Sequence, residues 1–78
     1  MSTQRFVIRT PADLGRTISE GRLARGVTQQ ELANRTGIER AYLSRMEGGL
    51  ETVQVQRIFA TLRALGIRLE ASMDLPNG

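Results

Sequence analysis

One segment most constrains what this chain can fold into: residues 27–49, which read VTQQELANRTGIERAYLSRMEGG. Thr28 and Glu31 have the spacing of a capping box, which marks the start of a helix. Gly37 ends that helix, because a residue without a Cβ readily takes a positive φ angle. A second helix, from about residue 39 to residue 47, follows the turn and stops at two further glycines. The segment therefore predicts a helix-turn-helix.

The two predicted helices each have an inward and an outward face. The inward positions are Leu32 and Ala33 of the first helix and Leu43 and Met46 of the second, and Ile38 is an apolar residue packed between the two helices. The outward positions of the second helix are Arg40, Ala41, Ser44 and Arg45. Such a polar, partly basic face is typical of a helix that enters the major groove of DNA.

A further helix is predicted before this segment, from residue 11 to about residue 25. Thr10 is a good N-cap, and the proline after it suits the first helical position. Leu14 and Ile18 are expected to face inward. Gly21 falls in the middle of the helix, where it costs about 1 kcal/mol relative to alanine. Apart from close packing, the sequence offers no reason for it.

A fourth helix is predicted to begin near Thr52 and to stop at Gly66. Its buried stripe is expected to contain Val55, Ile58, Phe59, Leu62 and Leu65. The two ends of the chain alternate between apolar and polar residues, which predicts strands at residues 5–9 and 67–73. The second strand has an apolar face made of Ile67, Leu69, Ala71 and Met73. A lone strand leaves backbone groups unpaired, so its partner is the first strand, the same strand of a second chain, or both.

Composition narrows the function. Residues 1–78 make a single domain, and a chain of 78 residues buries so little surface that dimerisation would help it to fold. The chain has no cysteine, no histidine and no apolar run of membrane-spanning length. Its net charge is +3, and between residues 22 and 45 five arginines face two glutamates. We expect no enzymatic activity, no metal and no cofactor, because no catalytic group of side chains is visible.

The pattern T-Q-Q-E-L-A…T-G-I-x-x-x-Y-L-S-R-M-E-G-G resembles the phage-repressor-type (XRE) helix-turn-helix family over roughly residues 18–65. This resemblance implies a mainly α, lambda-repressor-like bundle of four to five short helices. Short terminal strands would be added to it, and we expect these to pair across a dimer. The flanks VIRTPADLG and IRLEASMD are similar to those of HipB-type antitoxins, which repress their own operon and hold a HipA-type kinase.

Candidate base contacts lie at the start of the second motif helix. Arg40 can fork to guanine, Ala41 can touch a thymine methyl group, and Ser44 can bond to a base or a phosphate. The alternative for these positions is a solvated helix face. Glu39 either accepts from cytosine N4 or caps its own helix, and the capping role is favoured, because a carboxylate repels phosphate.

Candidate phosphate contacts surround these positions: Thr28, Gln29, Gln30, Arg35, Tyr42 and Arg45. The alternative for each is simple exposure to solvent. In the resembling family, the residue that matches Gln29 contacts the DNA backbone and braces the recognition helix. The family also pairs an arginine of the first helix with a glutamate at the end of the recognition helix. Arg22 and Glu47 match those two positions, which implies a structural ion pair.

Together these features predict a sequence-specific DNA-binding repressor that works as a homodimer on double-stranded operator DNA. Two recognition helices would enter successive major grooves about 34 Å apart. The narrower prediction is a HipB-like antitoxin that neutralises a HipA-like kinase, in the bacterial cytoplasm and on the nucleoid. The alternatives are a stand-alone phage-type or plasmid-type repressor and a protein-interaction module without DNA binding.

Overall fold

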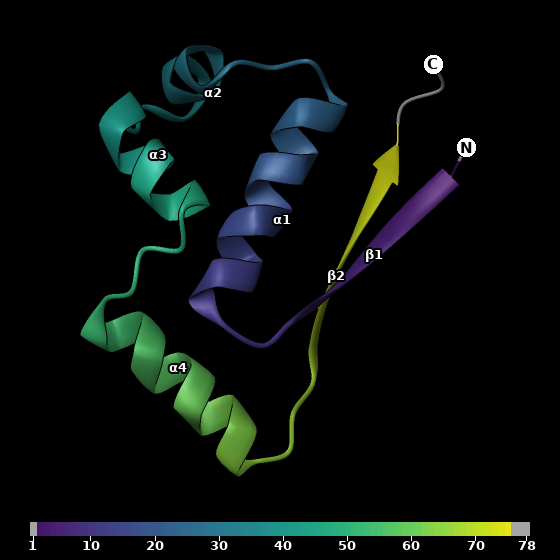
Figure 1. Cartoon of the computed structure of the whole chain (residues 1–78), viewed down its shortest axis with the longest axis vertical. Coiled ribbons are helices and arrows are strands. Elements are labelled where there is room, and N and C mark those ends of the chain that lie inside the picture. Colours follow the sequence, from purple (N-terminus) through teal and green to yellow (C-terminus); the bar gives the residue numbers. More distant parts are fainter. Residues whose placement is uncertain (1, 76–78) are drawn as a thin grey trace.

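Four helices and two terminal strands make up the computed structural model, which describes residues 2–75 (Figure 1). Their order is β1 (Ser2–Ile8), α1 (Pro11–Ala24), α2 (Gln29–Thr36), α3 (Arg40–Glu47), α4 (Val53–Ala64) and β2 (Leu69–Leu75). The predicted mainly α bundle with terminal strands is confirmed, and the described residues contain four helices. None of these helices is long and apolar enough to cross a membrane.

The two strands pair with each other in an antiparallel sheet. Ser2 lies opposite Leu75, and Ile8 lies opposite Leu69. Of the partners left open by the sequence, the first strand is therefore the one used within the chain. The strands extend beside the helices, and their far ends lie close together (Figure 1). The predicted alternation is confirmed from Glu70 to Leu75, whereas Leu69, predicted for the apolar face, is 37% exposed.

Three of the helices begin at a threonine whose hydroxyl accepts a hydrogen bond from the backbone three residues on: Thr10, Thr28 and Thr52. At Thr28 the predicted capping box is complete. Its hydroxyl accepts from the Glu31 backbone at 3.1 Å, and its own N–H donates to the Glu31 carboxylate at 3.4 Å. The start of the helix-turn-helix is thus determined locally, by two side chains that satisfy backbone N–H groups.

The apolar core is small for a chain of this length. Its buried hydrophobic residues, each at most 9% exposed, are Ile8, Val27, Ala33, Leu43 and Phe59, and Pro11 at the start of α1 is buried as well. The molecule is flat, with principal extents of 39 × 31 × 16 Å. A molecule this thin leaves one side of several elements without cover.

α1 and α3 touch backbone to backbone at Gly15. A Cβ at this buried glycine would overlap the carbonyl oxygen of Met46 and would lie 2.8 Å from that of Glu47. The end of the second motif helix therefore rests on the first half of α1. Glycine is required here by close approach rather than by its backbone angles, and the sequence alone did not reveal this contact.

The sheet lies against α1 at Gly21. A Cβ added to Gly21 would meet only the Met73 sulfur, at 3.3 Å. The close packing considered for Gly21 is therefore present, but its neighbour is the end of a flexible side chain.

Some predicted boundaries and buried positions are wrong. β2 begins at Leu69 rather than at residue 67, because the Ile67 N–H donates to the Leu62 carbonyl at 2.9 Å and so caps α4. Ile67 is therefore not part of the strand. In α4, Phe59 is buried as predicted, but Ile58 is 52% and Leu65 67% exposed.

Val55 and Leu62 are half-buried, and Leu14 in α1 is also exposed, against expectation. The reason is that α4 lies beside the other helices rather than over them (Figure 1), so only one narrow side of it is covered.

We predict opposite effects for alanine at the two glycines of α1. Gly15→Ala should destabilise the fold by about 2–3 kcal/mol, since the added methyl group meets rigid backbone. Gly21→Ala is the matched control: it should leave stability unchanged or raise it by up to about 1 kcal/mol, because Met73 can move and alanine favours a helix. Denaturant melts measure both. Equal effects of the two variants would contradict the close contact between α1 and α3.

Candidate nucleic-acid interface

The turn between α2 and α3 is made by Gly37. Its φ and ψ angles are 75° and 10°, in the left-handed region that side chains with a Cβ adopt only at a cost. Its N–H donates to the Ala33 carbonyl at 2.9 Å, and the Ile38 N–H donates to the Thr36 hydroxyl at 3.2 Å. The predicted end of α2 is confirmed, and the turn has a defined geometry that aims α3 away from α2.

α3 has the two faces that the sequence predicted. Leu43 is only 2% exposed and packs into the core, and Met46 is half-buried. Arg40, Ala41 and Ser44 are exposed. The first two turns of α3 therefore present one arginine, one methyl group and one hydroxyl to solvent on a helix that is anchored from behind.

Tyr42 and Arg45 form a pair on the exposed side of α3. The Arg45 guanidinium lies 5.4 Å from the centre of the Tyr42 ring, within the range of a cation–π contact. The contact restricts both side chains at the surface. Whether either of them contacts phosphate stays a prediction.

Glu39 does not cap α3 with its side chain. It occupies the N-cap position with φ −61° and ψ 140°, but its carboxylate makes no capping hydrogen bond. The predicted N-cap position of Glu39 is therefore confirmed, but its side chain makes no capping hydrogen bond. The physical reason is length: glutamate has one methylene more than aspartate, and the shorter Asp, Asn, Ser and Thr are the side chains that cap well. The Glu39 carboxylate is left exposed at the start of α3.

The start of α2 lies beside α3. Thr28 uses its hydroxyl for the capping box, and the Gln30 amide donates to Asn34 one turn further on at 3.1 Å. The first N–H groups of a helix have no partner within it, so those of Gln29 and Gln30 point out of its end. This geometry suits an anion.

An ion pair connects α1 to the end of α3. Arg22 Nε lies 2.8 Å from Glu47 Oε2, and Arg22 Nη2 lies 3.0 Å from Glu47 Oε1. The remaining Arg22 nitrogen, Nη1, donates to the Val27 carbonyl at 2.9 Å. The two side chains are only 13% and 7% exposed. The pair implied by the family resemblance is therefore present, in the bidentate geometry that makes such pairs strong.

Gln29 connects α2 to the ion pair between α1 and α3. Its amide donates to Glu47 Oε1 at 3.2 Å, and the side chain is half-buried. The bracing role implied for Gln29 is thus present, through Glu47 rather than through direct contact with the exposed face of α3. One carboxylate at the end of α3 receives donors from both α1 and α2.

The pKa of Glu47 reflects these contacts. The Arg22 hydrogen bonds lower the pKa of Glu47 from its ordinary value of 4.5, burial opposes them, and the bond from Gln29 lowers it further. The same hydrogen bonds raise the pKa of Arg22. Both groups therefore remain charged at neutral pH, and the pair is intact under physiological conditions.

Comparisons with known proteins agree with this geometry. Residues 13–74 match a family model described as a helix-turn-helix domain. The chain belongs to the helix-turn-helix domain family. It is also 30% identical, over 63 residues, to y4mF of Sinorhizobium fredii (strain NBRC 101917 / NGR234), which is described as an uncharacterized HTH-type transcriptional regulator. That alignment covers 81% of this chain and 83% of the relative. No solved structure matches the chain at a significant level.

The helix-turn-helix match extends well beyond α2 and α3. It begins near the start of α1 and ends within β2, so it includes both partners of the Arg22–Glu47 pair. DNA-binding regulation of transcription is the class of function that this family supports.

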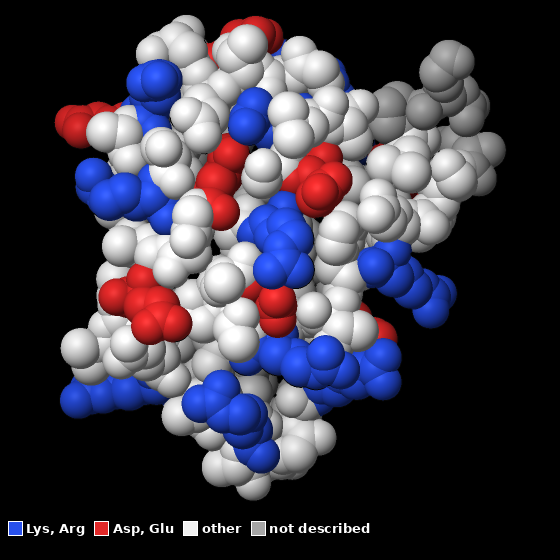
Figure 2. All heavy atoms as spheres, viewed as in Figure 1, with Lys and Arg blue, Asp and Glu red and all other residues white. Residues whose placement is uncertain are grey.

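Positive charge on the helix-turn-helix is scattered rather than continuous. Figure 2 shows basic side chains over the α2–α3 region interrupted by acidic ones, and a second group at the end of the molecule where α4 finishes. The charge of Arg22 in α1 is balanced by Glu47 at the end of α3. The positive charge that α2 and α3 present to solvent therefore comes from Arg35, Arg40 and Arg45. Among residues 2–75 no cluster of side chains is suited to hold a metal ion.

Sequence reasoning missed two contacts that position this interface. The first is the close approach of α3 to Gly15, and the second is the hydrogen bond from Arg22 to the Val27 carbonyl at the end of the loop after α1. The only sign of the first contact in the sequence is the small residue, Gly15, on one face of α1. The second has none, because backbone acceptors are the same at every position.

We predict that Glu47→Gln destabilises the fold by about 2 kcal/mol at pH 7, because it removes a charge-assisted, mostly buried interaction. The pKa of Glu47 is lowered in the folded state, so its contribution is fully present above about pH 4.5 and is lost as the pH falls towards the lowered value. Wild-type stability should therefore fall in acid more steeply than that of the variant. Denaturant melts at several pH values measure this.

The matched control is Glu20→Gln, which removes an exposed carboxylate from α1. It should change stability by less than about 0.5 kcal/mol. A similarly small change for Glu47→Gln would show that the pair does not hold the helices together.

Proposed function

We propose that this protein is a sequence-specific DNA-binding repressor that acts as a homodimer and reads its operator with α3. The observation that carries the proposal is the exposed face of α3, with Arg40, Ala41 and Ser44 on a helix anchored by Leu43 and by the Arg22–Glu47 pair. A rigid helix with polar side chains at its N-terminal end is the arrangement that helix-turn-helix proteins insert into the major groove.

Each exposed side chain is assigned the contact that its chemistry favours. Arg40 forks to O6 and N7 of a guanine, Ala41 packs on a thymine methyl group, and Ser44 bonds to a base or a phosphate. Glu39, which does not cap α3, is assigned to a cytosine N4 amino group.

Phosphates are contacted from both sides of the groove. The N-terminal end of α2, with Thr28, Gln29 and Gln30, takes one phosphate through its backbone N–H groups. Arg35, Tyr42 and Arg45 take others, and the Tyr42 ring holds the Arg45 guanidinium in place. These contacts supply affinity without selecting a sequence.

Two features of the chain support dimerisation. The core is small, while Val53 and Ile58 of α4 and Leu65, which follows its last residue, are each more than half exposed. In addition, β1 and β2 pair only with each other in the described residues, which leaves each strand one edge to pair with a second copy. We assign β2, with Leu69, Ala71 and Met73, as the main dimer element, and Ile67 adjoins it. A two-fold axis through this region would present two copies of α3 to successive major grooves.

The narrower proposal is an antitoxin of the HipB type, which represses its own operon and neutralises a HipA-like kinase. It rests on the similarity of the flanks VIRTPADLG and IRLEASMD, whose residues form parts of β1, α1 and β2. A stand-alone repressor has the same α3 face and lacks only the kinase partner. Arg40, Ser44 and Arg45 disfavour a protein-interaction module without DNA binding, because such a module does not require a basic helix face that fits the major groove.

We predict that Arg40→Ala weakens binding to an operator duplex, isolated by selection from random sequences, by about 1–3 kcal/mol. The loss should come with reduced discrimination at one base pair, because one bidentate base contact is removed. Titrations with the selected duplex and with a scrambled one measure this. Equal losses on both duplexes would show that Arg40 does not read a base.

The matched control is Arg45→Ala, which removes an arginine assigned to phosphate. It should weaken all duplexes alike and lower the slope of log affinity against log salt by about one unit.

We predict that a chain ending at Gly66 is largely monomeric and loses most of its affinity for the operator, because β2 is absent. Ile58→Glu, which places a charge on the exposed side of α4, is the comparison that separates strand from helix. Sedimentation and operator titration of both variants measure the outcome. A dimeric Gly66 chain together with a monomeric Ile58→Glu variant would move the dimer interface from β2 to α4.

A further inference from the structure

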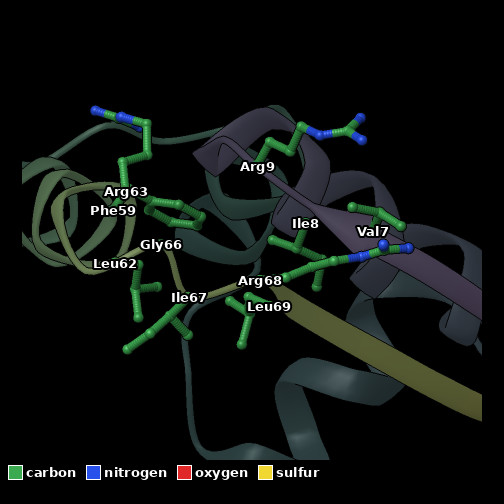
Figure 3. Close-up of a pocket in the computed structure, with 10 residues that line it drawn as sticks. All are labelled: Val7, Ile8, Arg9, Phe59, Leu62, Arg63, Gly66, Ile67, Arg68 and Leu69. Carbon is green, nitrogen blue, oxygen red and sulfur yellow. The ribbon is translucent and has the colours of Figure 1, made fainter.

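A second candidate binding surface lies at the opposite end of the molecule from α3. Here a hollow of about 310 Å³ opens between the end of β1, the last turn of α4 and the start of β2. Its floor is apolar and consists of Ile8, Phe59, Leu62 and Leu69, and Ile67 lies at its mouth. Figure 3 shows these side chains converging from the three elements. We call this site the arginine-rimmed hollow.

Three arginines form its rim: Arg9, Arg63 and Arg68. In Figure 3 the side chains of Arg9 and Arg63 extend to the periphery, away from the apolar side chains. Arg68 pairs with Glu70 at 3.0 Å, and among the described residues no ion pair engages Arg9 or Arg63. The rim therefore has a net positive charge even when Glu70 is counted.

The sequence builds this hollow through the cap of α4. Because the Ile67 N–H donates to the Leu62 carbonyl, the chain turns sharply at Gly66 and brings Ile67 and Arg68 to the mouth of the hollow. Ile67 is 50% exposed there, so its apolar side chain contacts solvent in a site that is also lined by three arginines. An isolated exposed isoleucine is ordinary, but one at the mouth of an apolar hollow is typical of a docking surface.

We propose that the arginine-rimmed hollow binds a segment of a partner protein that carries apolar anchor residues flanked by carboxylates. The apolar floor takes the anchors, and Arg9 and Arg63 pair with the flanking acidic groups. The volume lies at the lower end of the range for binding clefts, about 300–1,000 Å³, which fits a few side chains rather than a whole helix. This proposal stands independently of the DNA-binding function.

Two other occupants would each match only one part of the hollow. A second copy of this chain, placed about a two-fold axis on the hollow, would bring the same arginines face to face, and like charges across an interface are unfavourable. DNA would pair with the arginines but would leave the apolar floor exposed to water. Only an acidic segment with apolar side chains matches both parts of the site.

The test uses a fluorescein-labelled peptide that alternates aspartate and leucine, titrated with the full chain and followed by anisotropy. Arg63→Gln and Ile67→Ser should each weaken its binding by about fivefold, the effect of one partly exposed contact. Arg5→Gln and Leu23→Ser are the matched controls, since both residues are exposed and lie outside the hollow. They should leave peptide affinity unchanged, and Arg63→Gln should leave operator affinity unchanged.

Two further peptides test the chemistry. Replacing the leucines by serine removes the anchors, and replacing the aspartates by lysine reverses the charge. Both changes should weaken binding at least about tenfold, since each removes several contacts. Equal losses of peptide affinity for Arg63→Gln and Arg5→Gln would overturn the proposal, because the affinity would then depend on the net charge of the protein rather than on the hollow. Dissociation of a dimer by Ile67→Ser, with peptide affinity unaffected, would also overturn it and assign the hollow to a second copy.

Discussion

The Arg22–Glu47 pair is the interaction on which the rest of this structure depends. A single carboxylate at the end of α3 receives two hydrogen bonds from α1 and one from α2, while the same arginine holds the Val27 carbonyl at the end of the loop after α1. Three helices are thus fixed relative to one another at one point. Gly15 allows it, since a side chain there would keep the end of α3 away from α1. The exposed face of α3 is presented rigidly because its other end is held in this way.

This arrangement explains how so thin a molecule can present an ordered helix. With few fully buried apolar side chains, the hydrophobic core alone gives α3 limited support. The hydrogen bonds to Glu47 fix the orientation of α3 relative to α1 and α2, which hydrophobic burial alone does not do because it has no preferred direction. The same thinness leaves apolar side chains of α4 and of the α4–β2 turn exposed.

What the sequence predicted well is what local chemistry decides. Thr28 with Glu31, and Gly37, determine the limits of α2 through their own hydrogen bonds and backbone angles, and both predictions are confirmed. The spacing of apolar residues identified a common face along α4, but spacing does not show whether another element covers that face. Ile58 and Leu65 are exposed because no part of the described chain covers them. Glu39 had the right position for a cap and the wrong side-chain length. Contacts that depend on the path of a distant backbone, such as Gly15 against Met46, leave almost no trace in the sequence. The assigned DNA contacts remain predictions.

The central claim is that DNA is read by α3 and the start of α2 while the other end of the molecule stays free. Backbone amide spectra of the isotope-labelled protein, recorded during titration with a selected operator duplex, test it most directly. The account predicts that the large shift changes fall on residues 28–30 and 39–45 and that residues 58–69 change little beyond any effect of dimerisation. Large changes centred on α4 or on the sheet, with α3 unaffected, would contradict it.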